Sequence, residues 1–247
     1  LGLKQFKKLK KMSVTVFNDL DTLYKKSADI FVELSEKAIQ KHGKFVVALS
    51  GGSSPKAIFN LLATEEYSSK IDWTKIYFFW VDERWVPLND EKSNAKMTFE
   101  ALFNKVPVVK DQIFPMYKEG VEAVDFAKEY EQEVKNVLGE SGNFDFILLG
   151  MGDDGHTASL FPGEKILHEK EKWVDAFYLK SQEMFRITLT EPIINKAENI
   201  LVVTFGESKK HALNEVLNGE YNPELYPMQL IERKEGFQLF TDEKAKG

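Results

Sequence analysis

Residues 144–163 read FDFILLGMGDDGHTASLFPG, and the predicted fold is built around this stretch. The apolar run at 144–149 predicts a short buried strand. Within the next seven residues the chain places three glycines, two adjacent aspartates and a histidine. A buried strand that ends in such a loop is typical of an α/β sheet with a ligand site at its edge. We therefore predict that this loop carries the chemistry and that other segments bring a substrate to it.

The same alternation of strand, polar loop and helix recurs along most of the chain. Residues 45–49, FVVAL, form another continuous apolar run, as expected of a strand that is buried on both faces of a parallel sheet. Between Leu20 and Ala38, apolar residues recur at helical spacing, and Gly43 follows as a helix stop. This alternation predicts an α/β fold with a mostly parallel sheet flanked by helices. The predicted strands are residues 14–17, 45–49, 75–81, 144–149, 200–205 and 237–240.

After Gly163 the pattern changes. Residues 173–179 and 185–189 have the character of strands, and only five residues join them. A link that short favours an antiparallel pair. Arg186 lies near the start of its strand, so it reaches the proposed site only if that strand runs antiparallel to the others. The C-terminal half is therefore predicted to contain an antiparallel hairpin.

The composition indicates a folded, globular chain. The chain has 247 residues, of which 43% are hydrophobic, and a formal net charge of −6. An acidic chain without a dense basic stripe beyond its first residues is not expected to bind nucleic acid. No apolar run approaches the roughly 18 residues of a membrane-spanning helix. The chain has no cysteine, which excludes disulfides and thiolate nucleophiles, and we expect a cytoplasmic protein.

Residues 1–11, LGLKQFKKLKK, carry five lysines and precede Met12. We interpret them as a variable leader or a vector-derived remnant outside the fold, with a basic amphipathic anchor as the alternative. No low-complexity linker or internal repeat divides the remaining sequence. We therefore expect a single domain over residues 12–247.

Polar or glycine-containing loops follow several predicted strands, at Ser50, Asp82, Gly150 and Gly206. The carboxyl ends of parallel strands lie on one side of an open sheet, where ligands bind. These loops are therefore predicted to form one site.

The first of these loops, Ser50-Gly51-Gly52-Ser53-Ser54, has the character of a phosphate cradle. Its glycines let the backbone approach an anion closely, and the N–H groups at a helix start attract negative charge. We expect a helix to begin here with a serine hydroxyl as its cap and Pro55 in its first turn. The loop is not a P-loop, because no Gly-Lys-Ser/Thr follows at the required spacing.

The loop at 150–156 contains a literal G-x-G-x-x-G. A dinucleotide site is disfavoured, because Asp153 and Asp154 would face a pyrophosphate with negative charge. The alternative is a turn that presents Asp154 and His156 to a cleft. A histidine titrates near neutrality and can move a proton within one reaction cycle, while a nearby carboxylate fixes its tautomer. We interpret the three other histidines as surface or core residues that form no metal site: His42, His168 and His211.

Considered together, five segments resemble the 6-phosphogluconolactonase family, a branch of the group that includes glucosamine-6-phosphate isomerase/deaminase. They are residues 49–62, 80–97, 144–163, 186–200 and 206–213, with DGHTASLFPG and RITLT the most specific. The resemblance implies a Rossmann-like fold. It also implies hydrolysis of 6-phospho-D-glucono-1,5-lactone to 6-phosphogluconate, the second step of the oxidative pentose phosphate pathway, with no cofactor.

The resemblance implies roles for individual residues as well. His156 matches the family's proposed general base, and Asp154 is expected either to orient its imidazole or to bind a substrate hydroxyl. Residues 50–54 match the phosphate loop. The residues expected to bind substrate are Ser50, Gly51, Gly52, Ser53, Ser54, Asp82, Arg84, Arg186 and Lys209, and no metal is expected.

Two alternative functions stay open. An amino-sugar-6-phosphate deaminase carries a glutamate at the position of Phe161, and the phenylalanine here favours the lactonase. A non-catalytic sugar-phosphate sensor on the same fold would not require the Asp154/His156 pair. The expected partner is a small sugar-phosphate lactone, and the expected assembly is a monomer or a small homo-oligomer.

Overall fold

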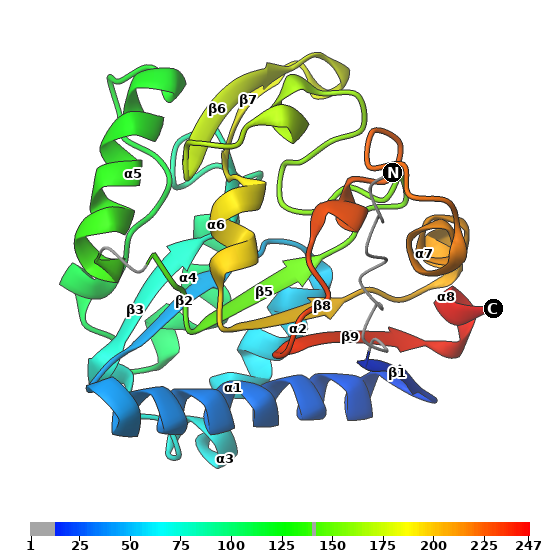
Figure 1. Cartoon of the computed structure of the whole chain (residues 1–247). Coiled ribbons are helices and arrows are strands. Elements are labelled where there is room, and N and C mark those ends of the chain that lie inside the picture. The colour runs from blue at the N-terminus through cyan, green and yellow to red at the C-terminus, as the bar shows by residue number, and fades with distance from the viewer. Residues whose placement is uncertain (1–12, 140–141) are drawn as a thin grey trace, which may run out of the picture.

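A computed structural model of the chain describes residues 13–139 and 142–247, so the predicted leader at 1–11 lies outside the described residues. A six-stranded sheet with the order β1-β9-β8-β5-β2-β3 crosses the molecule, and its paired strands run parallel (Figure 1). The predicted parallel sheet is confirmed. Its strands are β1 (Ser13–Phe17), β2 (Phe45–Leu49), β3 (Ile76–Trp80), β5 (Phe146–Gly150), β8 (Asn199–Val203) and β9 (Phe237–Asp242).

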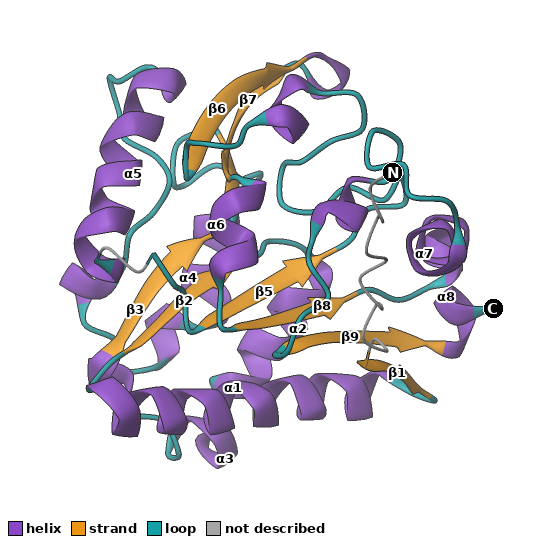
Figure 2. Ribbon diagram, in the orientation of Figure 1, coloured by secondary structure: helices purple, strands orange, loops and turns teal. Residues whose placement is uncertain are grey.

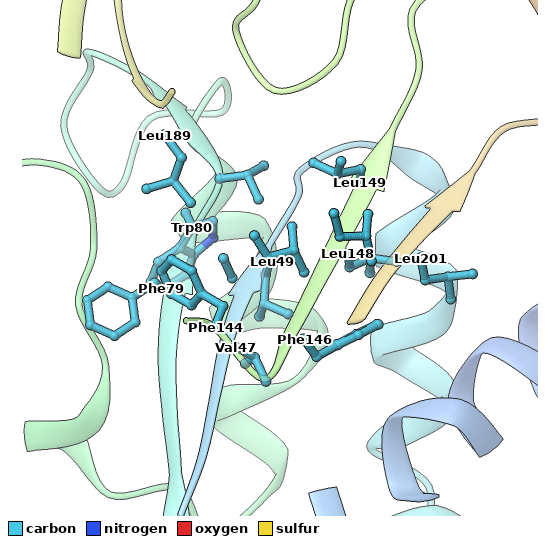
Figure 3. Packing of buried hydrophobic residues seen from close by; sticks show 14 of the residues in the cluster. Val47, Leu49, Phe79, Trp80, Phe144, Phe146, Leu148, Leu149, Leu189 and Leu201 are labelled. Carbon is cyan, nitrogen blue, oxygen red and sulfur yellow. The ribbon is translucent and has the colours of Figure 1, made fainter. Parts of the chain in front are cut away.

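The central strands are buried on both faces. Every residue of β2 is buried, and β3 and β5 pair with it on either side. Figure 3 shows Leu49 of β2 among side chains of its neighbours, including Trp80 of β3 and Leu148 of β5. The complete burial of each such side chain contributes about 1.5–3 kcal/mol to the stability of the fold. This explains why the strands appear in the sequence as continuous apolar runs rather than as alternating patterns.

Helices cover both sides of the sheet (Figure 2). The long helix α1 begins after Asp19, whose carboxylate accepts a hydrogen bond from the Thr22 N–H at 2.7 Å, and it ends at Gly43, where φ is 84°. No helix within residues 13–139 and 142–247 is long and apolar enough to cross a membrane. The α-helices are α1 (Leu20–His42), α2 (Ser53–Leu62), α3 (Glu65–Ser68), α4 (Asn94–Ala101), α5 (Ala123–Leu138), α6 (Glu191–Lys196), α7 (Lys210–Asn218) and α8 (Glu243–Lys246).

A second, smaller sheet has the order β4-β7-β6 and is antiparallel. The predicted hairpin is confirmed as β6 (Val174–Leu179) and β7 (Met184–Leu189). The prediction that residues 82–84 form a loop is wrong, because they form β4 (Asp82–Arg84) and pair with β7. Val81 is the transfer point: its N–H donates to Leu49 of the main sheet, and its carbonyl accepts from Leu189 of the small one. The sequence DER lacks the apolar residues typical of a strand, because β4 is stabilised by backbone pairing with β7 rather than by burial of apolar side chains.

Candidate active site

A pocket of about 280 Å³ opens where β2, β5 and β8 end. Loops that are far apart in the sequence meet there, as the topology of a parallel sheet requires. The lining residues are 50–55, 150–152, 156–158 and 203–205 together with Asp82, Arg84, Asn94 and Lys209.

The loop after β2 leads directly into α2, which begins at Ser53 with Gly52 at the N-cap position. The expected serine cap is absent: no side chain in the described part of the chain caps this helix, and Ser54 lies inside its first turn. Gly52 has φ of 103°, a backbone conformation that disfavours other residues. The hydroxyl of Ser50 donates to the Leu148 carbonyl at 2.8 Å, which ties the loop to β5. The first N–H groups of α2 therefore stay available to an anion in the pocket.

The loop after β5 folds back on itself and brings Asp154 against His156. Nδ1 of His156 lies 2.6 Å from Oδ1 of Asp154, and the same oxygen accepts the His156 backbone N–H at 3.1 Å. Burial alone would raise the pKa of Asp154, but the hydrogen bonds and charge of His156 outweigh it and hold that pKa below its ordinary value. Asp154 thus stays ionised and is placed to orient the imidazole. Among the described residues, Nε2 of His156 has no hydrogen-bond partner, and the side chain lines the pocket.

The segment after β3 supplies Asp82 and Arg84. Asp82 accepts a 2.6 Å hydrogen bond from the hydroxyl of Ser159, so it links β4 to the loop of His156. Arg84 donates from Nη1 to the Lys92 carbonyl at 2.8 Å, while its buried Nε has no hydrogen-bond partner among the described residues. Arg84 lines the pocket, where the positive charge of its guanidinium favours an anion.

The two remaining predicted basic residues differ in position. Lys209 lines the pocket and forms an ion pair with Asp153. Arg186 does not line it: only 4% of its side chain is exposed, and its Nη1 lies 3.9 Å from Oδ2 of Asp82. Burial lowers the pKa of Arg186, although a guanidinium remains protonated at neutral pH. The structure therefore places Arg186 behind the pocket surface, and its direct contact with substrate stays a prediction.

Asn94 and Thr204 line the pocket but were not predicted as site residues. The side-chain amide of Asn94 donates to the Asp82 carbonyl at 2.9 Å. A Cβ added to Gly51 would lie 1.8 Å from Oδ1 of Asn94. The segment that resembles the lactonases already contained Asn94. Thr204 carries no comparable signal, because it lies within the apolar run at 200–205 that was predicted as a strand.

The other histidines lie outside the pocket lining. His42 contacts Asp145 at 2.8 Å, His168 pairs with Glu224 at 3.2 Å, and His211 contacts the Tyr226 hydroxyl at 3.2 Å. No group of three or more His, Asp or Glu residues in the described part of the chain could hold a metal ion.

Glu83 of β4 anchors the site without lining it. Its carboxylate is fully buried and accepts hydrogen bonds from the backbone N–H groups of Arg84, Asn94 and Ala95 and from the Ser93 hydroxyl, at 2.8–3.0 Å. Burial raises the pKa of Glu83 to about 7, against these backbone hydrogen bonds, which lower it. The acid thus joins β4 to the start of α4.

The raised pKa of Glu83 predicts a pH dependence of stability. Between the ordinary value of 4.5 and about 7, the folded state holds a proton that the unfolded state releases, so the free energy of unfolding falls as pH rises through this range. The glutamine of Glu83→Gln does not titrate, and its amide N–H groups face backbone N–H donors in place of acceptors. We therefore expect the free energy of unfolding to fall by roughly 1–3 kcal/mol. Urea unfolding at several pH values measures both effects. The exposed Glu119→Gln is the control, and equal pH slopes in wild type and Glu83→Gln would contradict the prediction.

Comparisons with known proteins agree on one family. The family model described as "Glucosamine-6-phosphate isomerases/6-phosphogluconolactonase" matches residues 18–240. A rice protein (Oryza sativa subsp. indica) named "Probable 6-phosphogluconolactonase 4, chloroplastic" is 38% identical, over 94% of this chain and 75% of its own length. The solved structure of a 6-phosphogluconolactonase from Trypanosoma brucei superposes with a TM-score of 0.81 at 26% identity, over 95% of this chain and 97% of that one.

The fold alone does not separate the two activities in the family's description. A monomeric glucosamine-6-phosphate deaminase superposes with a TM-score of 0.82 at 19% identity, over 95% of this chain and 98% of that one. A likeness at this identity establishes the shared fold only. The activity must therefore be argued from the residues of the pocket.

Proposed function

This chain belongs to the glucosamine-6-phosphate isomerase/6-phosphogluconolactonase family, and we propose that it hydrolyses 6-phospho-D-glucono-1,5-lactone to 6-phosphogluconate. The observation that carries the proposal is the Asp154–His156 pair, which shares one pocket with the uncapped start of α2. A base and an anion site in one pocket fit a substrate with a reactive carbonyl at one end and a phosphate at the other.

In the proposed reaction, Nε2 of His156 takes a proton from a water molecule as the water oxygen bonds to C1 of the lactone. The carbonyl electrons move onto its oxygen, and a tetrahedral intermediate forms. When the carbonyl reforms, the bond from C1 to the ring oxygen breaks, and the imidazolium returns its proton to that oxygen. Asp154 stabilises the imidazolium between the two steps. The lactone carbonyl is electrophilic enough that these steps require no cofactor or covalent nucleophile.

The phosphate is proposed to bind at the loop of residues 50–54. Gly52, Ser53 and Ser54 at the start of α2 line the pocket, and the dipole of this ten-residue helix favours negative charge there. Arg84 and Lys209 add positive charge to the lining. Binding energy from this end of the substrate positions C1 beside the water and the base.

The pocket favours the lactonase over the deaminase alternative. Position 161, where the deaminase branch carries a glutamate, holds a buried phenylalanine that stacks on His156. No carboxylate at this position can assist ring opening. A sensor that only binds the sugar phosphate would not need the proton transfer for which the hydrogen-bonded Asp154–His156 pair is suited.

One assay separates the three functions. We expect rapid acid release when the protein receives freshly generated phosphogluconolactone, at a rate well above spontaneous hydrolysis, and no ammonia release from glucosamine 6-phosphate. A pH-stat and an ammonia assay measure the two products. Ammonia release would contradict the proposal in favour of the deaminase, and substrate binding without either product would favour the sensor.

We further propose a cytoplasmic protein, monomeric or a small homo-oligomer, whose partner is the sugar-phosphate lactone. The formal net charge of −6 supports a small-molecule partner over nucleic acid. The absence of cysteine is compatible with a reducing compartment.

A further inference from the structure

The imidazole of His156 is stacked on the ring of Phe161. The ring centroids are 4.1 Å apart, and the planes are inclined by 26°. The contact is close for two aromatic rings, whose centroids commonly lie about 4.5–7 Å apart. Phe161 thus contacts the proposed base directly, on a face of the imidazole that the Asp154 hydrogen bond does not use.

The hydrogen bond to Asp154 does not by itself fix the orientation of the imidazole, because one rotation of the ring remains possible. It fixes the direction of Nδ1, but the ring can still turn about the line that joins Nδ1 to the Asp154 oxygen. Such a rotation changes where Nε2 points, and Nε2 is the atom that must meet the water. A flat contact on the face of the ring removes this rotation. The hydrogen bond and the stack together define a single orientation of Nε2.

Ordinary core packing does not account for the position of Phe161. Its side chain is only 7% exposed, yet it is not part of the contiguous apolar core that the strands and helices share. Its neighbour Leu160 is fully buried and does belong to that core. Its ring stacks on the imidazole of His156 and lies near the guanidinium of Arg186.

Local backbone structure and Arg186 hold Phe161 in place. The Leu160 N–H donates to the Thr157 carbonyl at 2.9 Å, and Ala158 adopts φ of 49°, so the chain reverses between His156 and Phe161. The guanidinium carbon of Arg186 lies 5.8 Å from the Phe161 ring centroid. Arg186 is itself fixed on β7 by contacts with Gln182 and Asp82.

We propose that Phe161 is a positioning residue that sets the plane of the His156 imidazole and thereby aims Nε2 at the attacking water. Arg186 supports the Phe161 ring from β7. This inference rests on the proposed lactonase function and deepens it, because it assigns a task to a residue that touches the base rather than the substrate.

The test compares Phe161→Leu with Phe161→Tyr. Leucine keeps an apolar side chain of similar size but lacks the flat ring, whereas tyrosine keeps the ring. Misplacement of a reacting group by about 1 Å costs up to about 10²-fold in rate, so we expect kcat to fall roughly 10- to 100-fold in Phe161→Leu. We expect KM to stay within about twofold, because the phosphate binds elsewhere in the pocket. Phe161→Tyr should restore most of kcat.

A spectroscopic measurement reports the stack independently of turnover. The imidazole protons of His156 lie over an aromatic face and should resonate upfield of those of an exposed histidine such as His168. This displacement should vanish in Phe161→Leu and persist in Phe161→Tyr. Proton NMR with histidine-selective labelling measures it.

Phe17→Leu is the matched control, since it removes a buried ring that packs on Phe240 away from the pocket. It should lower stability and leave kcat unchanged. Unchanged kcat in Phe161→Leu would overturn the inference. Equal losses of kcat in Phe161→Leu and Phe161→Tyr, in proportion to their losses of thermal stability, would also overturn it. Failure of the proposed function is a different result, namely that wild-type protein does not accelerate lactone hydrolysis at all.

Discussion

His156→Ala is expected to lower lactone turnover by roughly 10²–10⁴-fold, the usual contribution of a positioned general base. The imidazole is the one titratable group of the pocket that is paired with a carboxylate and still presents a free nitrogen, among the residues that the structure describes. Without it, water must attack the lactone without transferring its proton to the protein. KM should change little, because the alanine leaves the loop at 50–54 intact. The measurement is the initial rate of acid release after subtraction of the spontaneous rate.

His168→Ala is the matched control for this substitution. His168 pairs with Glu224 at the surface, and 68% of its side chain is exposed. Its removal should leave both turnover and KM unchanged. If His156→Ala retains wild-type turnover while remaining folded, His156 is not the base and the proposed mechanism fails.

Gly152→Ala is expected to lower kcat by roughly 10- to 100-fold, although it adds only one methyl group. The backbone of Gly152 does not adopt a positive φ, so alanine meets no conformational penalty there. The added Cβ, however, would lie 2.1 Å from Nδ1 of His156 and 2.6 Å from Oδ1 of Asp154. Contacts this short force the two side chains apart and break the hydrogen bond that orients the base. Steady-state kinetics with the lactone measure the loss.

Gly43→Ala provides the control for an added methyl group. Gly43 ends α1 with φ of 84°, and a Cβ there meets none of the described residues within 4 Å. Alanine in this left-handed conformation should cost about 1 kcal/mol of stability, without any change in turnover. Wild-type kcat in Gly152→Ala would show that the pair of Asp154 and His156 tolerates displacement, which contradicts the proposed role of their contact.

The main sheet was predictable because its signal is local. A strand that is buried on both faces must be apolar throughout, as β2 is, and a helix that ends in a left-handed residue favours glycine, as α1 does at Gly43. These requirements act on neighbouring residues, so the resulting patterns can be recognised in short segments of the sequence. β4 escaped prediction because its stability comes from pairing with β7, about a hundred residues further along the chain.

Within the site, local sequence was enough to identify the segments that carry the proposed chemistry. The Asp154–His156 contact spans two residues, and the turn that makes it is encoded by adjacent glycines, so it could be anticipated from one loop. The order of strand and helix also implied that the loops after β2 and β5 end at one edge of the sheet.

The division of tasks among these residues became visible only in three dimensions. Lys209 lies on the pocket wall and Arg186 behind it, against Phe161, although both had the same expected role. Helix α2 is uncapped where a serine cap was expected, and Phe161 is stacked on the base. The physical reason is that such contacts join side chains from different elements, whose directions depend on how β4, β7 and the main sheet pack together. No local pattern of residues records that packing.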